Sequence, residues 1–288
     1  MLNLIHAQTF LAVIEEGGFR PAARKLALSP STAIEHIRQL EYDLAAPLLV
    51  RRRGQVAPTA QGTLFEPLAR ALVNTAGRAH ELITKAPLRV AASSNVGIYS
   101  LQPRLASFKS EHGITVEPWI GPNPAVADRL SHGLADVAVM EWWDGRLGFT
   151  AATWRREALK VIVSPEHAWA GRGTIDASEL VGTRILGGEH GSGTGTVLRK
   201  ALGRLKYELT TIDGYGSTEA VKRAVRAGQG ISIMLVSTVA DEIATGALAA
   251  VDVKDVPLEK EICIVVPSGL PERASGARFI SHMLSQGT

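Results

Sequence analysis

The sequence has one cysteine, few aromatic residues and no long apolar run. Cys263 stands alone in the apolar stretch ICIVV, which excludes an intrachain disulfide and any metal cluster built from several thiolates. Aromatic residues make up 5% of the 288 residues, so the core must be mainly aliphatic. No apolar run approaches the ~18 residues that cross a bilayer, and the N-terminus lacks the basic region of a secretory signal. These absences predict a cytoplasmic protein with no membrane partner.

Motifs for catalysis and nucleotide binding are also missing. The eight histidines are scattered, without HExxH spacing, and no paired-carboxylate motif occurs. The glycine-rich stretch GGEHGSGTGT lacks the lysine of a Walker motif, and Thr196 stands where the third glycine of GxGxxG belongs. We therefore expect no enzyme activity, no catalytic residue, no bound metal and no cofactor.

Positive charge is confined to the first third of the chain. Residues 1–87 hold 10 Lys and Arg against 7 Asp and Glu, a net charge of +3. The whole chain has 31 against 28, so residues 88–288 hold 21 of each and are neutral. An excess of three charges is small enough to arise by chance, and a basic surface for nucleic acid is the alternative.

The first 58 residues have the pattern of three helices followed by a β-hairpin. Apolar residues recur every three to four positions in three successive segments, which is the helical period. Ser29 suits the N-cap of the third helix, and Pro30 suits its first position, where an N–H would have no partner. The stretch PLLVRRRGQVAPT, residues 47–59, then predicts two short strands. This order is that of a winged helix-turn-helix.

Residues 59–86 predict one long helix with an apolar seam. Spacings of three and four are typical of a helix that packs against a second copy, and a helix packed on its own domain is the alternative. Pro67 lies inside this helix and should bend it. The expected dimerisation residues are Phe65, Leu68, Leu72, Ala79 and Leu82.

Short aliphatic runs alternate with helical patterns throughout residues 87–288. Such alternation predicts a sheet covered by helices on both faces. The number of units indicates two α/β lobes. We expect lobe I at about 87–158 and 267–288, and lobe II at about 159–266.

The chain resembles the LysR-type transcriptional regulators over nearly its whole length. The resemblance rests on FLAVIEEGGF, AARKL, PLLVRR and PTAQG in the first third, and on LRVAAS, HGLADVAV, HGSGT and STEAVKRAVRAGQGISIM later. It implies a winged helix-turn-helix, a linker helix and a two-lobed effector domain like a periplasmic binding protein. It also implies homodimers or homotetramers, double-stranded DNA as partner, and a small-molecule effector. RNA polymerase is a further candidate partner.

The expected recognition helix departs from the pattern of the family it resembles. Pro30 stands in place of the usual glutamine and Ile34 in place of the usual serine, and Glu35 follows. Glu35 can accept a hydrogen bond from cytosine N4, or it can be a surface residue that pairs with Arg38 or Gln39. Most of the affinity must then come from arginines that contact phosphates. The candidate DNA-binding residues are Arg20, Arg24, Ser29, Ser31, Thr32, Glu35, Arg38, Arg51, Arg52 and Arg53.

Small hydroxyl residues follow three expected strands at the points where helices begin. Free N–H groups at helix N-termini bind anions, and the carboxyl ends of strands are the usual ligand sites of open α/β sheets. Simple N-capping is the alternative for each residue taken alone. The expected ligand is a small anionic metabolite such as a carboxylate. The candidate effector-binding residues are Ser93, Ser94, Asn95, Asn123, Ser192, Gly193, Thr194, Ser217 and Thr218.

Two other functions compete with that of a ligand-responsive regulator. The altered recognition helix is also compatible with a homologue that only dimerises or binds proteins. A solute-binding protein or an enzyme on the same two lobes is less well supported, because the sequence begins with a helix-turn-helix pattern and lacks catalytic motifs.

Overall fold

The computed structural model describes residues 2–52, 55–83, 86–188 and 193–285. The chain forms two compact units, residues 1–89 with 127–136 and residues 90–126 with 137–288. Each helix in the described ranges is too short or too polar to span a bilayer.

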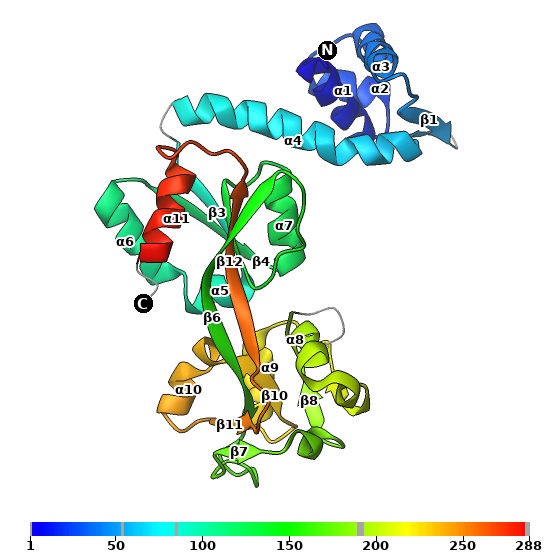
Figure 1. Cartoon of the computed structure of the whole chain (residues 1–288). Helices are drawn as coiled ribbons and strands as arrows, with labels where there is room; N and C mark the ends of the chain where they lie inside the picture. The colour runs from blue at the N-terminus through cyan, green and yellow to red at the C-terminus, as the bar shows by residue number, and fades with distance from the viewer. Residues whose placement is uncertain (1, 53–54, 84–85, 189–192, 286–288) are drawn as a thin grey trace. The chain divides into compact units, whose positions relative to one another are not determined.

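The first unit begins with α1 (Leu4–Glu15), α2 (Phe19–Lys25) and α3 (Pro30–Leu44) (Figure 1). The Ser29 hydroxyl accepts a hydrogen bond from the Thr32 N–H at 3.0 Å, and Pro30 occupies the first turn of α3. Both roles predicted from the sequence are confirmed. The start of α3 is thus fixed by local chemistry, because the cap provides an acceptor for an N–H group that has no partner within the helix.

The hairpin consists of β1 (Leu49–Arg52) and β2 (Gln55–Pro58), paired antiparallel with Arg51 opposite Val56. The backbone N–H groups of Leu48 and Leu49 donate to the Glu41 carboxylate at 2.7 and 3.1 Å, which ties the hairpin to α3. The predicted wing is therefore present. Arg53 lies outside the described residues.

Helix α4 (Ala60–Ile83) follows the hairpin and contains Pro67, as predicted. It begins in the stretch PTAQG, where the Thr59 hydroxyl accepts from the Gly62 N–H at 3.0 Å. A Cβ at Gly62 would lie 2.1 Å from the backbone oxygen of Leu48. The helix can approach the hairpin this closely because residue 62 has no side chain.

The residues of the predicted apolar seam of α4 differ in exposure. Phe65 is buried in the core of the first unit, 5.3 Å from the Phe10 ring between centroids, so it is not part of an exposed face. Leu64, Leu68 and Leu72 are exposed instead. A regular spacing of three and four cannot distinguish the two faces, because residues on either side of a helix repeat with the same period.

The second half of α4 holds the segment that contains HGLAD. The buried Arg78 donates from Nε to one Asp136 oxygen at 3.0 Å and from Nη2 to the other at 2.7 Å. Arg78 also donates to the Pro87 carbonyl at 2.7 Å, and Asn74 donates to the His132 carbonyl at 2.7 Å. A two-point arginine–carboxylate pair fixes orientation as well as distance. Residues 127–136 are thus held firmly on the linker helix.

One eight-stranded sheet runs through the second unit in the order β4-β3-β5-β12-β6-β11-β7, with β10 also paired to β6. A separate pair, β8 and β9, lies parallel. These strands are β3 (Leu88–Ser93), β4 (Val116–Gly121), β5 (Val137–Met140), β6 (Phe149–Val163), β7 (Thr174–Ile175), β8 (Arg184–Leu186), β9 (Thr210–Ile212), β10 (Ser232–Leu235), β11 (Ala249–Val253) and β12 (Glu259–Pro267).

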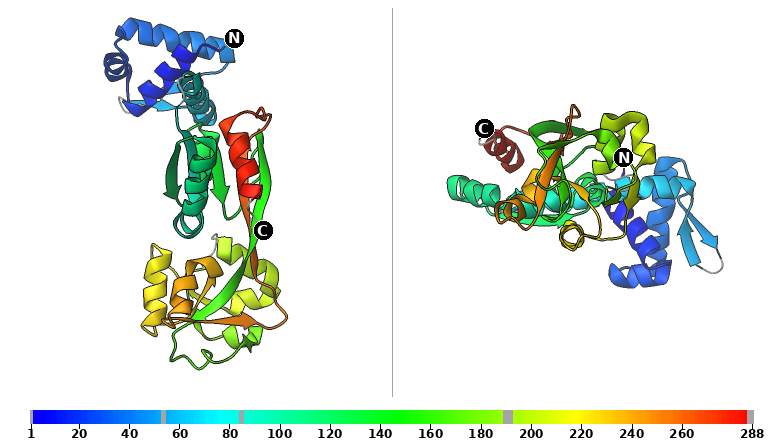
Figure 2. Two further views of the ribbon diagram at one scale, coloured as in Figure 1. Left: turned by 90° about the vertical axis from the view of Figure 1, so that its left-hand side faces the viewer. Right: turned by 90° about the horizontal axis from the view of Figure 1, so that it is seen from below.

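Helices pack on this sheet in two groups, one in each of two lobes (Figures 1 and 2). They are α5 (Ser94–Tyr99), α6 (Gln102–His112), α7 (Asn123–Ser131), α8 (Gly193–Leu202), α9 (Thr218–Arg226), α10 (Ala240–Ala244) and α11 (Ser275–Ser285). The predicted α/β architecture is confirmed. Helix α11 was not predicted as an element, although its residues were assigned to lobe I.

Strands β6 and β12 belong to both lobes, and Figure 2 shows them side by side. Residues 149–158 of β6 pair with β12, whereas its later residues pair with β10 and β11 of the second lobe. β12 pairs in turn with β5 of the first lobe. The predicted limits at 158 and 266 therefore fall inside shared strands. A limit placed by composition cannot show that one strand serves two cores.

Replacing Gly62 by Ala should destabilise the first unit by several kcal/mol, because overpacking against a fixed carbonyl forces the backbone to move. Chemical denaturation of the full chain, followed by circular dichroism, measures the change. Gly77 is a matched control on the same helix, since a Cβ there would have open space. Gly77→Ala should leave stability unchanged or raise it by up to about 1 kcal/mol. Equal stability of the two variants would contradict the close approach.

Candidate functional site

Seven of the nine predicted effector residues line one cavity of about 390 Å³ between the two lobes of the second unit. They are Ser94, Asn95, Asn123, Gly193, Thr194, Ser217 and Thr218. Ser93 is buried at the end of β3, and its hydroxyl has no hydrogen-bond partner among the described residues. Ser192 lies outside the described residues. The structure thus brings together residues over 120 positions apart in the sequence, which were selected because they follow the ends of strands.

Several of these side chains already have protein partners. Asn123 donates to the Trp142 carbonyl and accepts from the Glu141 N–H, both at 2.9 Å, which joins the ends of β4 and β5. Ser217 accepts from the Ala220 N–H at 3.2 Å and so caps α9. The capping alternative therefore holds for Ser217.

One hydrogen bond in the cavity joins the two lobes. The Thr218 hydroxyl at the start of α9 donates to the Asn95 amide oxygen on α5 at 2.6 Å. The two residues are predicted effector ligands from opposite lobes. A ligand that exchanges hydrogen bonds with either of them would act on the separation of the lobes as well.

A buried ion pair that the sequence analysis missed forms part of the same cavity. Lys260 of β12 is 4% exposed and its ammonium group binds the Glu141 carboxylate, which follows β5. In the sequence, three charged residues in a row, Glu259, Lys260 and Glu261, suggest an exposed strand end. The alternation along β12 indicates that Lys260 is buried, because it shares a face with the buried Ile262 and Ile264.

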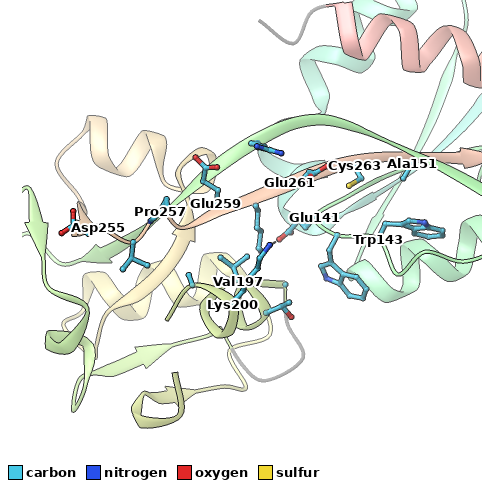
Figure 3. Close-up of a pocket in the computed structure, with 17 residues that line it drawn as sticks. Glu141, Trp143, Ala151, Val197, Lys200, Asp255, Pro257, Glu259, Glu261 and Cys263 are labelled. Carbon is cyan, nitrogen blue, oxygen red and sulfur yellow. Dashed lines mark hydrogen bonds and ion pairs between the residues drawn. The ribbon is translucent and has the colours of Figure 1, made fainter. Parts of the chain in front are cut away.

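The same ion pair lines a second, larger cavity of about 1040 Å³ (Figure 3). Trp142 and Trp143 contribute aromatic surface, and the Trp143 ring meets Phe149 edge-on at 5.8 Å. A Cβ at Gly193 would lie 2.9 Å from Trp142 and 3.3 Å from the Lys260 ammonium nitrogen. The absence of a side chain at residue 193 thus lets α8 begin against the ion pair.

Cys263 also lines the larger cavity. Burial, and secondly the charge of Glu261, raise the pKa of the Cys263 thiol. A thiol with a raised pKa is a weaker nucleophile at neutral pH, since the thiolate is the reactive form.

In the first unit, the predicted DNA-contacting residues of α3 form an exposed face. Ser31, Ile34, Glu35 and Arg38 are exposed, and Thr32 is half-buried beside the cap. Arg38 lies 3.6 Å from Glu35 with both side chains exposed. The pairing alternative for Glu35 is therefore present, although such exposed pairs contribute little to stability.

The predicted arginines outside α3 lie on α2 and in the hairpin. Arg20, Arg24 and Arg51 are exposed. Arg52 is a strand residue whose side chain, like the whole of Arg53, lies outside what the structure describes. Lys25 is also exposed, but it forms ion pairs with Glu15 at 3.1 Å and Glu16 at 2.9 Å, so its charge is largely compensated.

A buried contact sets the orientation of α3 against α1. The Thr9 hydroxyl lies 2.8 Å from the Ile5 carbonyl oxygen and shares a hydrogen bond of 2.9 Å with His36 Nδ1. The His36 ring stacks on His6 with centroids 4.6 Å apart. Burial, and secondly the nearby His6, lower the pKa of His36, so the ring is mainly neutral at neutral pH.

Comparisons with known proteins give a family match for the N-terminal part of the chain and another for the rest. The model of the bacterial regulatory helix-turn-helix protein, lysR family, matches residues 4–63, and that of the LysR substrate binding domain matches residues 84–288. The putative HTH-type transcriptional regulator protein PtxE of Stutzerimonas stutzeri is 41% identical over 197 residues, which cover 67% of this chain and all of that protein.

Solved structures share the fold over the full length. ArgP from Mycobacterium tuberculosis superposes with a TM-score of 0.74 at 19% identity, covering 100% of this chain and 98% of that one. Full-length CbnR complexed with its target DNA gives a TM-score of 0.57 at 22% identity, covering both chains completely. With the helix-turn-helix unit and the two-lobed unit both in place, the chain belongs to the LysR family of transcriptional regulators.

Proposed function

We propose that residues 1–58 bind double-stranded DNA, residues 59–86 form a dimerising linker helix, and residues 87–288 bind an effector that changes how promoter DNA is held. The observation that carries this proposal is the exposed face of α3, in the same unit as the exposed hairpin arginine Arg51. CbnR, which has the same fold, has been solved with its target DNA. We place the protein in the cytoplasm and assign it no catalytic step.

The α3 face supports an unusual mode of base reading. Recognition helices present their N-terminal residues to base edges in the major groove. Ser31 and Thr32 can donate to bases or phosphates, and Ile34 can contact a thymine methyl group. Glu35 can accept from cytosine N4 once Arg38 turns to the backbone. Arg20, Arg24, Ser29 and the wing arginines Arg51, Arg52 and Arg53 then serve phosphates, which supply affinity and fix register.

The exposed leucines of α4 support a homodimer. Leu64, Leu68 and Leu72 are exposed, and a groove of about 360 Å³ beside them is lined by α4 residues such as Leu72 and Ala79 together with residues 2–4 and 7. The linker helix of a second copy would cover these apolar surfaces. Two helix-turn-helix units then read half-sites about one helical turn apart or multiples of it. Pairing of such dimers gives a tetramer, and RNA polymerase is a further candidate partner.

The cavity between the lobes favours a small anion such as a carboxylate. Helices α7, α8 and α9 all begin at its wall, and their N-terminal N–H groups attract negative charge. An ammonium group has three N–H donors, of which Glu141 takes one from Lys260. A carboxylate bound here would share Lys260 with Glu141 and contact the hydroxyls of Ser94 and Thr194.

A module that only dimerises or binds proteins is the second candidate, because Pro30, Ile34 and Glu35 remove donors from α3. Selection of genomic fragments by the purified full-length protein separates the two candidates. Enrichment of a shared inverted repeat supports the regulator, and no enrichment at low salt supports the module.

Replacing Arg51 and Arg52 together by Ala should weaken binding to every duplex sequence. The slope of log K against log salt should fall by about 2 for each bound subunit, because each lost phosphate contact removes about 0.9. Fluorescence anisotropy at several salt concentrations measures this slope. Arg223→Ala, an exposed arginine of α9 in the second unit, is the matched control and should change nothing. An unchanged slope in the double variant would show that the wing does not contact DNA.

Replacing Glu35 by Gln should change sequence preference without a general loss of affinity. Gln can donate as well as accept, so discrimination at one base pair should shift by about 1–3 kcal/mol. Selection from randomised duplexes reads out the preference. Gln39→Glu on the same exposed helix should leave the preferred base pair as it is, since Gln39 bonds to Asp43 at 2.9 Å. Identical preferences for wild type and Glu35→Gln would remove Glu35 from base reading.

The double substitution E141Q/K260M should weaken binding of an anionic effector while preserving the fold, because it removes both charges of the buried pair. Loss of one charge-assisted hydrogen bond weakens affinity roughly tenfold to a hundredfold. Thermal shift with a panel of small carboxylates and inorganic oxyanions identifies the ligand, and titration gives its affinity. Lys200→Ala, which removes a lysine from the larger cavity, should keep the affinity. Full affinity in the double variant would rule out Lys260 as the anion contact.

A further inference from the structure

A cluster of two histidines and a glutamate joins α6 to α11 in the first lobe, away from the cavities described above. Glu111 and His112 end α6, and the buried His282 lies on α11. One ligand atom from each of the three side chains lies within 4.8 Å of the others. Neither the effector cavity nor the DNA-binding face uses these residues.

A hydrogen bond to Ser107 orients the His282 ring. The Ser107 hydroxyl lies 2.8 Å from His282 Nε2 and 3.1 Å from the Arg104 carbonyl oxygen. With Nε2 held by Ser107, Nδ1 is the ring nitrogen that faces Glu111.

The other ring nitrogen of His282 lies beside a carboxylate. His282 Nδ1 and Glu111 Oε2 are 3.2 Å apart, a distance that an N–H···O hydrogen bond or a shared metal ion can bridge. This separation is close to that of two ligands on one tetrahedral ion, given bonds of about 2.0–2.2 Å.

His112 provides a third ligand at the same place. Its ring lies edge-on to the His282 ring at 81°, with centroids 5.6 Å apart. Two imidazoles on one tetrahedral ion place their ring centres about 5 Å apart when the bonds are about 2 Å long. His112 is exposed, so its side chain has room to turn toward the other two ligands.

We propose that Glu111, His112 and His282 bind one divalent transition-metal ion, for which zinc is the probe. Two imidazoles with one carboxylate match the ligands that zinc takes, and water would complete the coordination. Ser107 acts as a positioning residue, because its bond to Nε2 fixes the direction of the His282 ring. The ion clamps the C-terminal helix α11 to α6, where Phe108 and Phe279 already pack edge-on at 5.1 Å.

Calorimetric titration of the untagged, metal-free full-length protein with zinc should reveal one site per chain in this cluster. His112→Ala and Glu111→Gln, both at exposed positions, should each weaken that site at least tenfold. Ser107→Ala should weaken it by about 10- to 100-fold, as outer partners of metal ligands do. Lys109→Ala on the same helix and Glu117→Gln on β4 are matched controls at exposed positions and should keep the wild-type affinity.

Cobalt provides a second readout that does not depend on stability. Co²⁺ in the site should show the visible absorption of a four- or five-coordinate ion, and this absorption should be lost in His112→Ala. Zinc should also raise the melting temperature of the wild type but not of His112→Ala. Retention of both the zinc site and the cobalt spectrum in His112→Ala and Glu111→Gln would overturn the proposal. So would the absence of zinc binding by the wild type.

Discussion

The antiparallel pair β6 and β12 is the constraint on which the second unit depends. Its ladder runs from Glu259 opposite Ala158 to Pro267 opposite Phe149, and each strand also pairs with strands of a lobe core. Any change in the separation of the lobes must bend or twist this ladder. The register shifts at Ile262 and Cys263, and such an irregularity locally increases twist. Lys260 stands two residues from this point, so the charge at the cavity and the bend of the ladder are adjacent.

The cavity is lined by polar groups that are largely engaged with one another. Asn95 with Thr218, and Lys260 with Glu141, are pairs that close the space between the lobes. An effector bound in this cavity, as we propose, would act by exchange, because it would have to offer acceptors that replace those partners. Only a difference in affinity between open and closed arrangements can shift their populations. Contacts that cross from one lobe to the other provide that difference.

In the proposed mode of DNA binding, affinity and specificity come from different elements. The hairpin and α2 carry exposed arginines, whereas the exposed face of α3 carries Ile34 and Glu35. The arginines would contact phosphates of any sequence, and the apolar and acidic side chains on α3 would select by methyl contact and by rejection of wrong partners. The orientation of that face depends on the contact between Thr9 and His36. A helix fixed in this way can discriminate with few direct hydrogen bonds.

The sequence by itself determined the order of elements, the N-cap at Ser29, the hairpin and the alternation of strands and helices, because these follow from local periodicity and turn chemistry. Sequence reasoning also selected nine residues of which seven line one cavity, since strand ends converge in an α/β sheet. Tertiary structure alone decided that Phe65 is buried while Leu68 is exposed, and that Lys260 and Glu141 meet inside the protein. It also decided that His282 lies against Glu111, 171 positions away. These pairings depend on which helix face and which strand face become buried. Local sequence cannot determine the buried face by periodicity alone, because both faces of an element repeat with the same period.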